Sequence, residues 1–98
     1  MSKPLTPFME RYAKERASMP EDTLLLMRLG DFYEMFFEDA TRGAKAMGIA
    51  LCHTRQGIPM AGISCHAVDS YIKNMGDPSI KTIILSDAGH QTRRQPGQ

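Results

Sequence analysis

Phe32 and Glu34 stand two residues apart in the segment 30–34 (GDFYE), directly after the apolar run 24–29. We expect this segment to be a strand-to-helix turn that opens a helix running to about Met47. At helical spacing, that helix has a complete apolar face without either side chain, made by Tyr33, Phe36, Phe37, Ala40, Ala44 and Met47. An exposed aromatic ring beside an acceptor-only group suits a flat, hydrogen-bonding partner such as a nucleobase.

The same two side chains also have ordinary structural explanations. Asp31 and Glu34 have the spacing of a capping box, in which Glu34 satisfies the backbone amide of the N-cap residue. Phe32 lies at the edge of the helix's apolar face, where it can pack at the border of the core. The residues alone therefore leave the structural and the functional explanation open for each side chain.

The pattern of apolar residues and turn residues predicts how these side chains are positioned. In order, we expect a helix over 7–18, a strand over 23–29, a helix over 31–47, a strand over 49–53, an edge or irregular strand over 58–63, a helix over 65–75 and a strand over 80–85. The continuous hydrophobicity of 23–29 is typical of a strand covered on both faces. The predicted fold class is therefore α/β, with a mixed β-sheet flanked by about three α-helices.

A chain of 98 residues is expected to form one small domain. We place that domain at residues 1–89. Residues 87–98 lack apolar side chains apart from Ala88. We therefore expect residues 90–98 to form a disordered tail.

Charge is distributed unevenly, although the net charge is only +1. Residues 21–39 carry six Asp or Glu against Arg28 alone, whereas residues 40–98 carry seven Lys or Arg against three Asp. Strong binding to a phosphate backbone comes mainly from Lys and Arg. An acidic surrounding for Phe32 and Glu34 therefore predicts weak nucleic-acid binding by this chain alone.

Several other classes of function are not expected. The N-terminal residues carry no apolar segment of a secretory signal and no apolar run approaches the ~20 residues that span a bilayer, so we expect a cytoplasmic protein with no membrane partner. The chain has only two cysteines, Cys52 and Cys65, and so sparse a pair in a cytosolic protein is more often reduced than bridged, so we expect free thiols. Cys52-His53 and Cys65-His66 lack the spacing of metal ligands, such as Cys-x-x-Cys, so we expect no metal site. We also expect no catalytic residue and no cofactor, because the chain has no phosphate loop and no oriented nucleophile.

Four motifs in fixed order carry a resemblance to a known family. They are Thr6-Pro7, the segment 28–36 (RLGDFYEMF), the segment 58–63 (IPMAGI), and His66-Ala67-Val68 followed by Tyr71. Together they resemble the N-terminal mismatch-recognition domain, domain I, of the bacterial MutS DNA mismatch-repair family. Ser64-Cys65 stands where the family commonly has a Pro-Tyr pair. We also expect this module to lack the family's basic final strand and its connector, lever, clamp and ATPase domains.

The resemblance implies roles for individual residues. In the family, the aromatic residue of the Phe-x-Glu motif wedges into the minor groove and stacks on a mispaired base, and the glutamate hydrogen-bonds that base; Phe32 and Glu34 match these positions. Met60 belongs to a segment that lies near the distorted base step in the family, with core packing as its alternative role. Arg55 is expected on a turn, where it can contact a DNA phosphate or remain solvated.

We therefore expect a stand-alone, non-enzymatic DNA-binding module that reads mismatched or distorted double-stranded DNA in mismatch repair. Its expected DNA-side residues are Phe32, Glu34, Met60 and Arg55. Other mismatch-repair proteins are further expected partners. The alternative is a module of the same fold that binds proteins or forms a homodimer, with no direct DNA contact.

Overall fold

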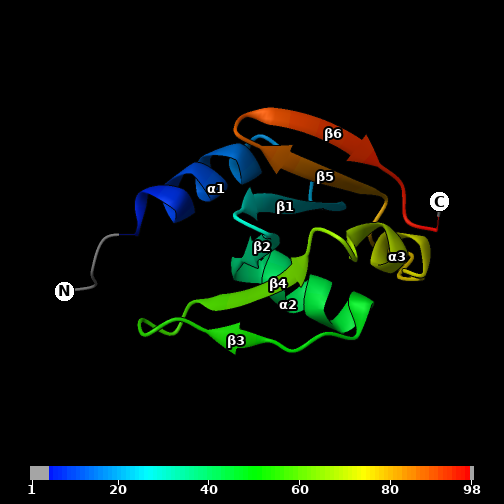
Figure 1. The fold of residues 1–98 in the computed structure, drawn as a ribbon, viewed down its shortest axis with the longest axis horizontal. Helices are drawn as coiled ribbons and strands as arrows, with labels where there is room; N and C mark the ends of the chain where they lie inside the picture. The colour runs from blue at the N-terminus through cyan, green and yellow to red at the C-terminus, as the bar shows by residue number, and fades with distance from the viewer. Residues whose placement is uncertain (1–4, 98) are drawn as a thin grey trace.

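The computed structural model describes residues 5–97, which form three helices and six strands (Figure 1). The helices are α1 (Pro7–Ala17), α2 (Phe37–Met47) and α3 (Val68–Lys73). The strands are β1 (Thr23–Leu29), β2 (Phe32–Phe36), β3 (Cys52–His53), β4 (Pro59–Ser64), β5 (Thr82–Asp87) and β6 (His90–Arg94). They form one mixed sheet in the order β3-β4-β2-β1-β5-β6, which confirms the predicted α/β fold class.

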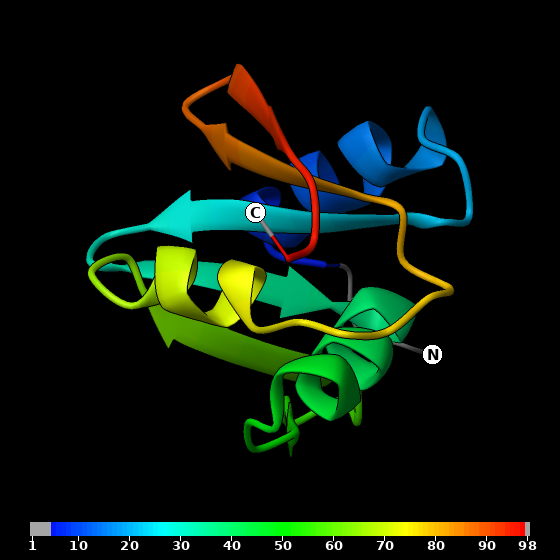
Figure 2. The ribbon, with the colours of Figure 1, turned by 90° about the vertical axis from the view of Figure 1, so that its right-hand side faces the viewer.

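The central strand β1 is covered on both faces of the sheet. It pairs parallel to β5 and antiparallel to β2. Leu24 and Leu26 are buried in the cluster that α2 and α3 cover, whereas Leu25 and Met27 are buried in the cluster that α1 covers. Figure 2 shows the two layers, with α1 behind the sheet and α2 and α3 in front of it. β1 is therefore continuously apolar because both of its faces are buried, as the sequence predicts.

Helix α1 begins where the sequence indicates. The Thr6 hydroxyl accepts a hydrogen bond from the Met9 backbone amide at 3.2 Å, and Pro7 occupies the first turn. The chain turns away from the helix at Ser18, two residues before Pro20. Both ends of α1 are therefore set by local sequence.

A buried carboxylate fastens α1 to α2. Asp39 of α2 is 2% exposed and pairs with Arg16 of α1 and with Arg42, each at 3.0 Å. The Tyr12 hydroxyl lies 2.8 Å from an Asp39 oxygen and 2.5 Å from the Leu25 carbonyl oxygen, so two acceptors share its proton. Burial raises the pKa of Tyr12 well above its usual value, which keeps the phenol a donor. These contacts fix where α1 lies over the sheet.

Residues 32–36 form β2 and not the first turns of a helix, which corrects the predicted strand-to-helix turn. Gly30, with a φ of 60°, and Asp31 make a tight turn between β1 and β2. β2 then pairs with β1 on one side and β4 on the other, and two rows of backbone hydrogen bonds favour the strand over a helix. The helix begins at Phe37 and ends before Gly48, whose φ of 70° is the predicted left-handed cap.

The strand predicted over 58–63 also differs from the prediction. β4 lies inside the sheet between β3 and β2, although a proline in the segment favours an edge. Pro59 is the first residue of β4 and faces only the two-residue strand β3, so its missing amide donor removes little pairing. The strand predicted over 49–53 is shortened to β3, and the helix predicted over 65–75 is shortened to α3.

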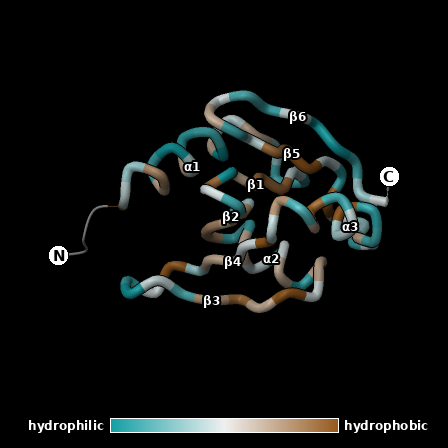
Figure 3. The backbone as a smooth tube through the Cα atoms, viewed as in Figure 1, coloured by the Kyte–Doolittle hydropathy of each residue, from teal (hydrophilic) through white to brown (hydrophobic). Residues whose placement is uncertain are grey.

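The C-terminal segment predicted to be disordered contains β6, which corrects that prediction. Ala88 and Gly89, with φ of 49° and 85°, make the turn that pairs β6 antiparallel to β5. The tube is hydrophilic along β6 (Figure 3). Its support is therefore backbone pairing together with polar contacts, such as the 2.7 Å hydrogen bond that Gln91 donates to Glu15 and the Arg94–Asp69 ion pair. Within residues 5–97, no helix is long and apolar enough to cross a membrane.

We predict that Tyr12→Phe lowers the free energy of unfolding by about 1–3 kcal/mol, because two buried acceptors lose their donor. Urea denaturation of both proteins measures the change. Tyr71→Phe is the matched control, since Tyr71 is only partly buried and its hydroxyl has no hydrogen-bond partner within residues 5–97. Equal effects of the two substitutions would contradict a structural role for the Tyr12 hydroxyl.

Candidate nucleic-acid interface

Helix α1 covers only part of its face of the sheet. Beneath it, Met27, Phe36 and Ile84 are buried. Where β1 and β2 approach their shared turn, Leu29 is 52% exposed and Phe32 is 49% exposed. Leu51 is the only other large hydrophobic side chain that is exposed in the part of the chain that the structure describes. We call the uncovered region the open sheet face, and define it by Leu29, Phe32, Glu34, Gly62 and Ser64.

The pairing register brings Phe32 and Glu34 together on this face. Alternate residues of a strand point to the same side, so Phe32 and Glu34 share the side of the buried Phe36. Phe32 pairs with Leu29 of β1 and Ser64 of β4, and Glu34 pairs with Gly62 of β4. The aromatic ring and the carboxylate are therefore neighbours on one surface, which the helical interpretation did not foresee.

The capping-box explanation of Glu34 is wrong. Asp31 lies in the β1–β2 turn and Glu34 in the middle of β2. The residue that precedes α2 is Phe36, and no side chain caps that helix. Glu34 therefore has no part in starting a helix.

Glu34 lies against a glycine of the neighbouring strand. A Cβ atom at Gly62 would lie 2.8 Å from both carboxylate oxygens of Glu34, so the missing side chain makes room for the carboxylate. Partial burial raises the pKa of the Glu34 carboxyl above its usual range. Within residues 5–97, no group donates a hydrogen bond to this carboxylate. It is thus a partly buried acceptor that is available to a partner.

The other two sequence-predicted residues differ in their positions. Met60 of β4 is partly buried beside Phe36 and packs against the core cluster under α1, so it borders the open sheet face. Arg55 is exposed in the turn that precedes Pro59, the first residue of β4. Ser64, which pairs with Phe32, is the last residue of β4. The structure groups Met60 with Phe32 and Glu34 and separates Arg55 from them by the length of β4.

Sequence reasoning missed Leu29 and Gly62. The sequence pattern places Leu29 in a strand covered on both faces, and it shows Gly62 only as part of a motif shared with the family. A hairpin centred on Gly30 and Asp31 would indicate Leu29, because it pairs Leu29 with Phe32. Gly62 is placed only by the register between β2 and β4.

The open sheet face offers a ring for stacking and an oxygen for accepting a hydrogen bond. Within residues 5–97, no three His, Cys, Asp or Glu side chains lie close enough to hold a metal ion. Cys52 is exposed, Cys65 is partly exposed, and no disulfide joins them. The arrangement is suited to binding a flat polar group.

We predict that Glu34→Gln stabilises the folded chain at neutral pH. Because the folded-state pKa of Glu34 is raised, ionisation of this carboxyl disfavours folding as pH rises above the unfolded-state value of about 4.3. The advantage of the variant should therefore shrink as pH falls below about 4. Thermal unfolding across pH, with exposed Glu21→Gln as the control for a lost negative charge, measures it. A variant equally or less stable at neutral pH would contradict the cause given for the shift.

Comparison with known proteins identifies the family. The family model described as MutS domain I matches residues 6–89. The chain is 46% identical over 80 residues to the DNA mismatch repair protein MutS of Thermotoga neapolitana, covering 82% of this chain and 10% of that protein. It is 40% identical over 92 residues to the DNA mismatch repair protein MutS of Borrelia hermsii, covering 94% of this chain and 10% of that protein. The chain thus spans about a tenth of the length of these relatives. It belongs to the MutS domain I family.

Proposed function

We propose that this chain is a non-enzymatic module that reads mismatched or distorted duplex DNA in mismatch repair. Phe32 stacks on a displaced base in the minor groove, and Glu34 accepts a hydrogen bond from that base. The observation that carries the proposal is the pairing of an exposed ring and an available carboxylate on the open sheet face. Membership of the MutS domain I family, and relatives named as mismatch-repair proteins, support it.

The wedge role follows from the energetics of DNA deformation. A mismatched base step costs less to unstack and kink than a paired one, so an inserted apolar side chain binds the mismatched step preferentially. Phe32 extends from a strand that is paired on both sides, so the backbone beneath the ring is fixed before DNA arrives. Little conformational entropy is lost when the ring inserts.

Glu34 contributes discrimination more than affinity. An ionised carboxylate is repelled by the phosphates that border a minor groove unless it accepts a hydrogen bond from a base. Partial burial raises the pKa of Glu34, so the charged form is already disfavoured in this position before any phosphate approaches it. A base that offers no donor leaves the repulsion uncompensated, so it is rejected.

Binding by this chain alone is weak, since acidic residues dominate the segment 21–39 around the site. Other mismatch-repair proteins are expected to supply the additional affinity for DNA. Met60 contributes at the border of the site. Arg55, at the far end of β4, contacts a phosphate outside the wedge step.

A second candidate function is self-association through the same surface. Leu29 and Phe32 form an adjacent exposed apolar pair. An exposed aromatic ring can pack into an oligomer interface as readily as it can stack on a base. Light scattering with and without DNA distinguishes the two. A homodimer that Phe32→Ala dissociates and DNA does not would favour this candidate.

We predict that the chain binds G·T and single-base-bulge duplexes more tightly than a matched duplex at low salt, as measured by fluorescence anisotropy. Phe32→Ala should weaken binding to both distorted duplexes by about 5- to 100-fold, the value of one base–aromatic stack. Leu51→Ala, which truncates the other exposed apolar side chain, is the matched control and should bind as the wild type does. Equal affinity for all three duplexes, unaltered in Phe32→Ala, would contradict the proposal.

A further inference from the structure

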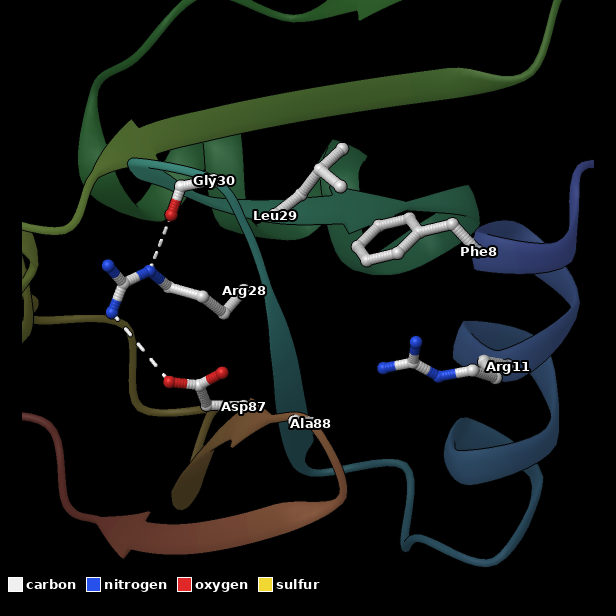
Figure 4. A pocket seen from close by; sticks show the side chains of 7 residues that line it. All are labelled: Phe8, Arg11, Arg28, Leu29, Gly30, Asp87 and Ala88. Atoms are coloured by element: carbon white, nitrogen blue, oxygen red, sulfur yellow. Dashed lines mark hydrogen bonds and ion pairs between the residues drawn. The ribbon is translucent and has the colours of Figure 1, made fainter.

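An open hollow of about 350 Å³ lies beside the open sheet face, between α1 and the turns at the ends of β1 and β5 (Figure 4). Phe8 and Arg11 line it from α1, and Leu29 lines it from β1. Leu29 is also the direct partner of Phe32 in the β1–β2 pairing. The hollow therefore borders the residue that carries the proposed wedge.

Arg11 is a positive charge that the protein does not neutralise. Its guanidinium points into the hollow (Figure 4) and has no carboxylate within ion-pair distance in residues 5–97. Four other arginines each pair with an aspartate, namely Arg16, Arg28, Arg42 and Arg94. One guanidinium nitrogen donates a long 3.9 Å hydrogen bond to the uncharged sulfur of Met27, so the positive charge of Arg11 remains available to an anion.

The position of Arg11 is linked to β2 through aromatic contacts. The guanidinium carbon lies 5.8 Å from the centre of the Phe8 ring, within the range of a cation–π contact. The Phe8 ring packs edge-on against Phe36 at a centroid distance of 5.9 Å. Since Phe36 and Phe32 belong to the same strand, the cation and the exposed ring are held on one framework.

The second arginine of the hollow is already occupied. The Arg28 Nε donates a 2.7 Å hydrogen bond to the Gly30 carbonyl oxygen, and its Nη1 lies 3.7 Å from Asp87. Arg28 therefore stabilises the β1–β2 turn and offsets the Asp87 carboxylate, which also lines the hollow. An anion entering the hollow has Arg11 as its available partner.

Together with the proposed function, on which this inference rests, the geometry points to a phosphate site. We propose that Arg11 binds a backbone phosphate of the DNA strand that flanks Phe32 on the α1 side. The minor groove is only about 6 Å wide, so a side chain inserted into it has a backbone close on each side. On the α1 side of Phe32, its partner Leu29 lines the same hollow as Arg11, so the proposal places that backbone over Leu29 and next to the guanidinium.

We predict that Arg11→Gln lowers the salt dependence of DNA binding and keeps the preference for mismatches. Loss of one phosphate contact should reduce the slope of log K against log salt by about 1. The fall in affinity between 50 and 200 mM salt should accordingly become about fourfold smaller. Arg11→Lys should retain the wild-type slope, because a phosphate contact requires charge and not a planar group. Anisotropy titrations with the G·T and matched duplexes give both quantities.

The exposed Lys45 of α2, on the opposite side of the sheet, gives the matched control, since Lys45→Gln removes the same charge. An Arg11→Gln slope equal to that of Lys45→Gln, with mismatch preference intact in both, would overturn the phosphate site and leave the proposed function standing. Absence of mismatch preference in the wild type would instead defeat the proposed function, and the Arg11 site with it. Phe32→Ala should show the reverse pattern to Arg11→Gln, with an unchanged slope and lost preference.

Discussion

Burial of Phe36 between α1 and the sheet determines the direction of every other side chain in β2. Phe36 packs edge-on against Tyr12 and Phe8, and this contact allows only one orientation of the strand. Because the strand alternates with a period of two, Glu34 and Phe32 must share the side of Phe36, while Met35 enters the opposite core. A slip of one residue would bury the carboxylate on the other face. The site therefore depends on core packing two and four residues away from it.

The open sheet face also depends on how far α1 extends. Asp39 holds Tyr12 and Arg16 of α1 at fixed positions, so the helix covers one end of β1 and β2 and leaves the other uncovered. Two arginines and a tyrosine hydroxyl compensate the buried charge of Asp39, so the ion cluster sets position without leaving an unpaired charge. Core packing thus orients Phe32, and the buried ion cluster keeps the surface around it free.

Some of this architecture can be predicted from sequence because it rests on local chemistry. The N-cap of Thr6, the buried strand β1 and the left-handed Gly48 follow from single residues or short patterns. β2 could not be predicted because Tyr33 and Phe36 fit one face of a helix, whereas in the strand they lie on opposite faces that are both packed. Only pairing with β1 and β4 decides between the two structures. β6 could not be predicted because it is held by backbone hydrogen bonds to β5, and such pairing gives its sequence no apolar pattern. The family resemblance indicates Phe32 and Glu34. That they share a surface with Leu29 and Gly62 follows only from the pairing register of β2 with β1 and β4.

The central claim is that DNA meets the open sheet face beside Phe32 and Glu34. Side-chain NMR spectra recorded during titration with a G·T duplex test it most directly. We expect the resonances of the Phe32 ring and of the Leu29 and Met60 methyl groups to shift strongly. Those of Val68 and Ile72, which α3 buries against the other face of the sheet, should stay in place. Shifts confined to the α2 and α3 side, or to the Arg55 turn, with an unperturbed Phe32 ring, would contradict the account.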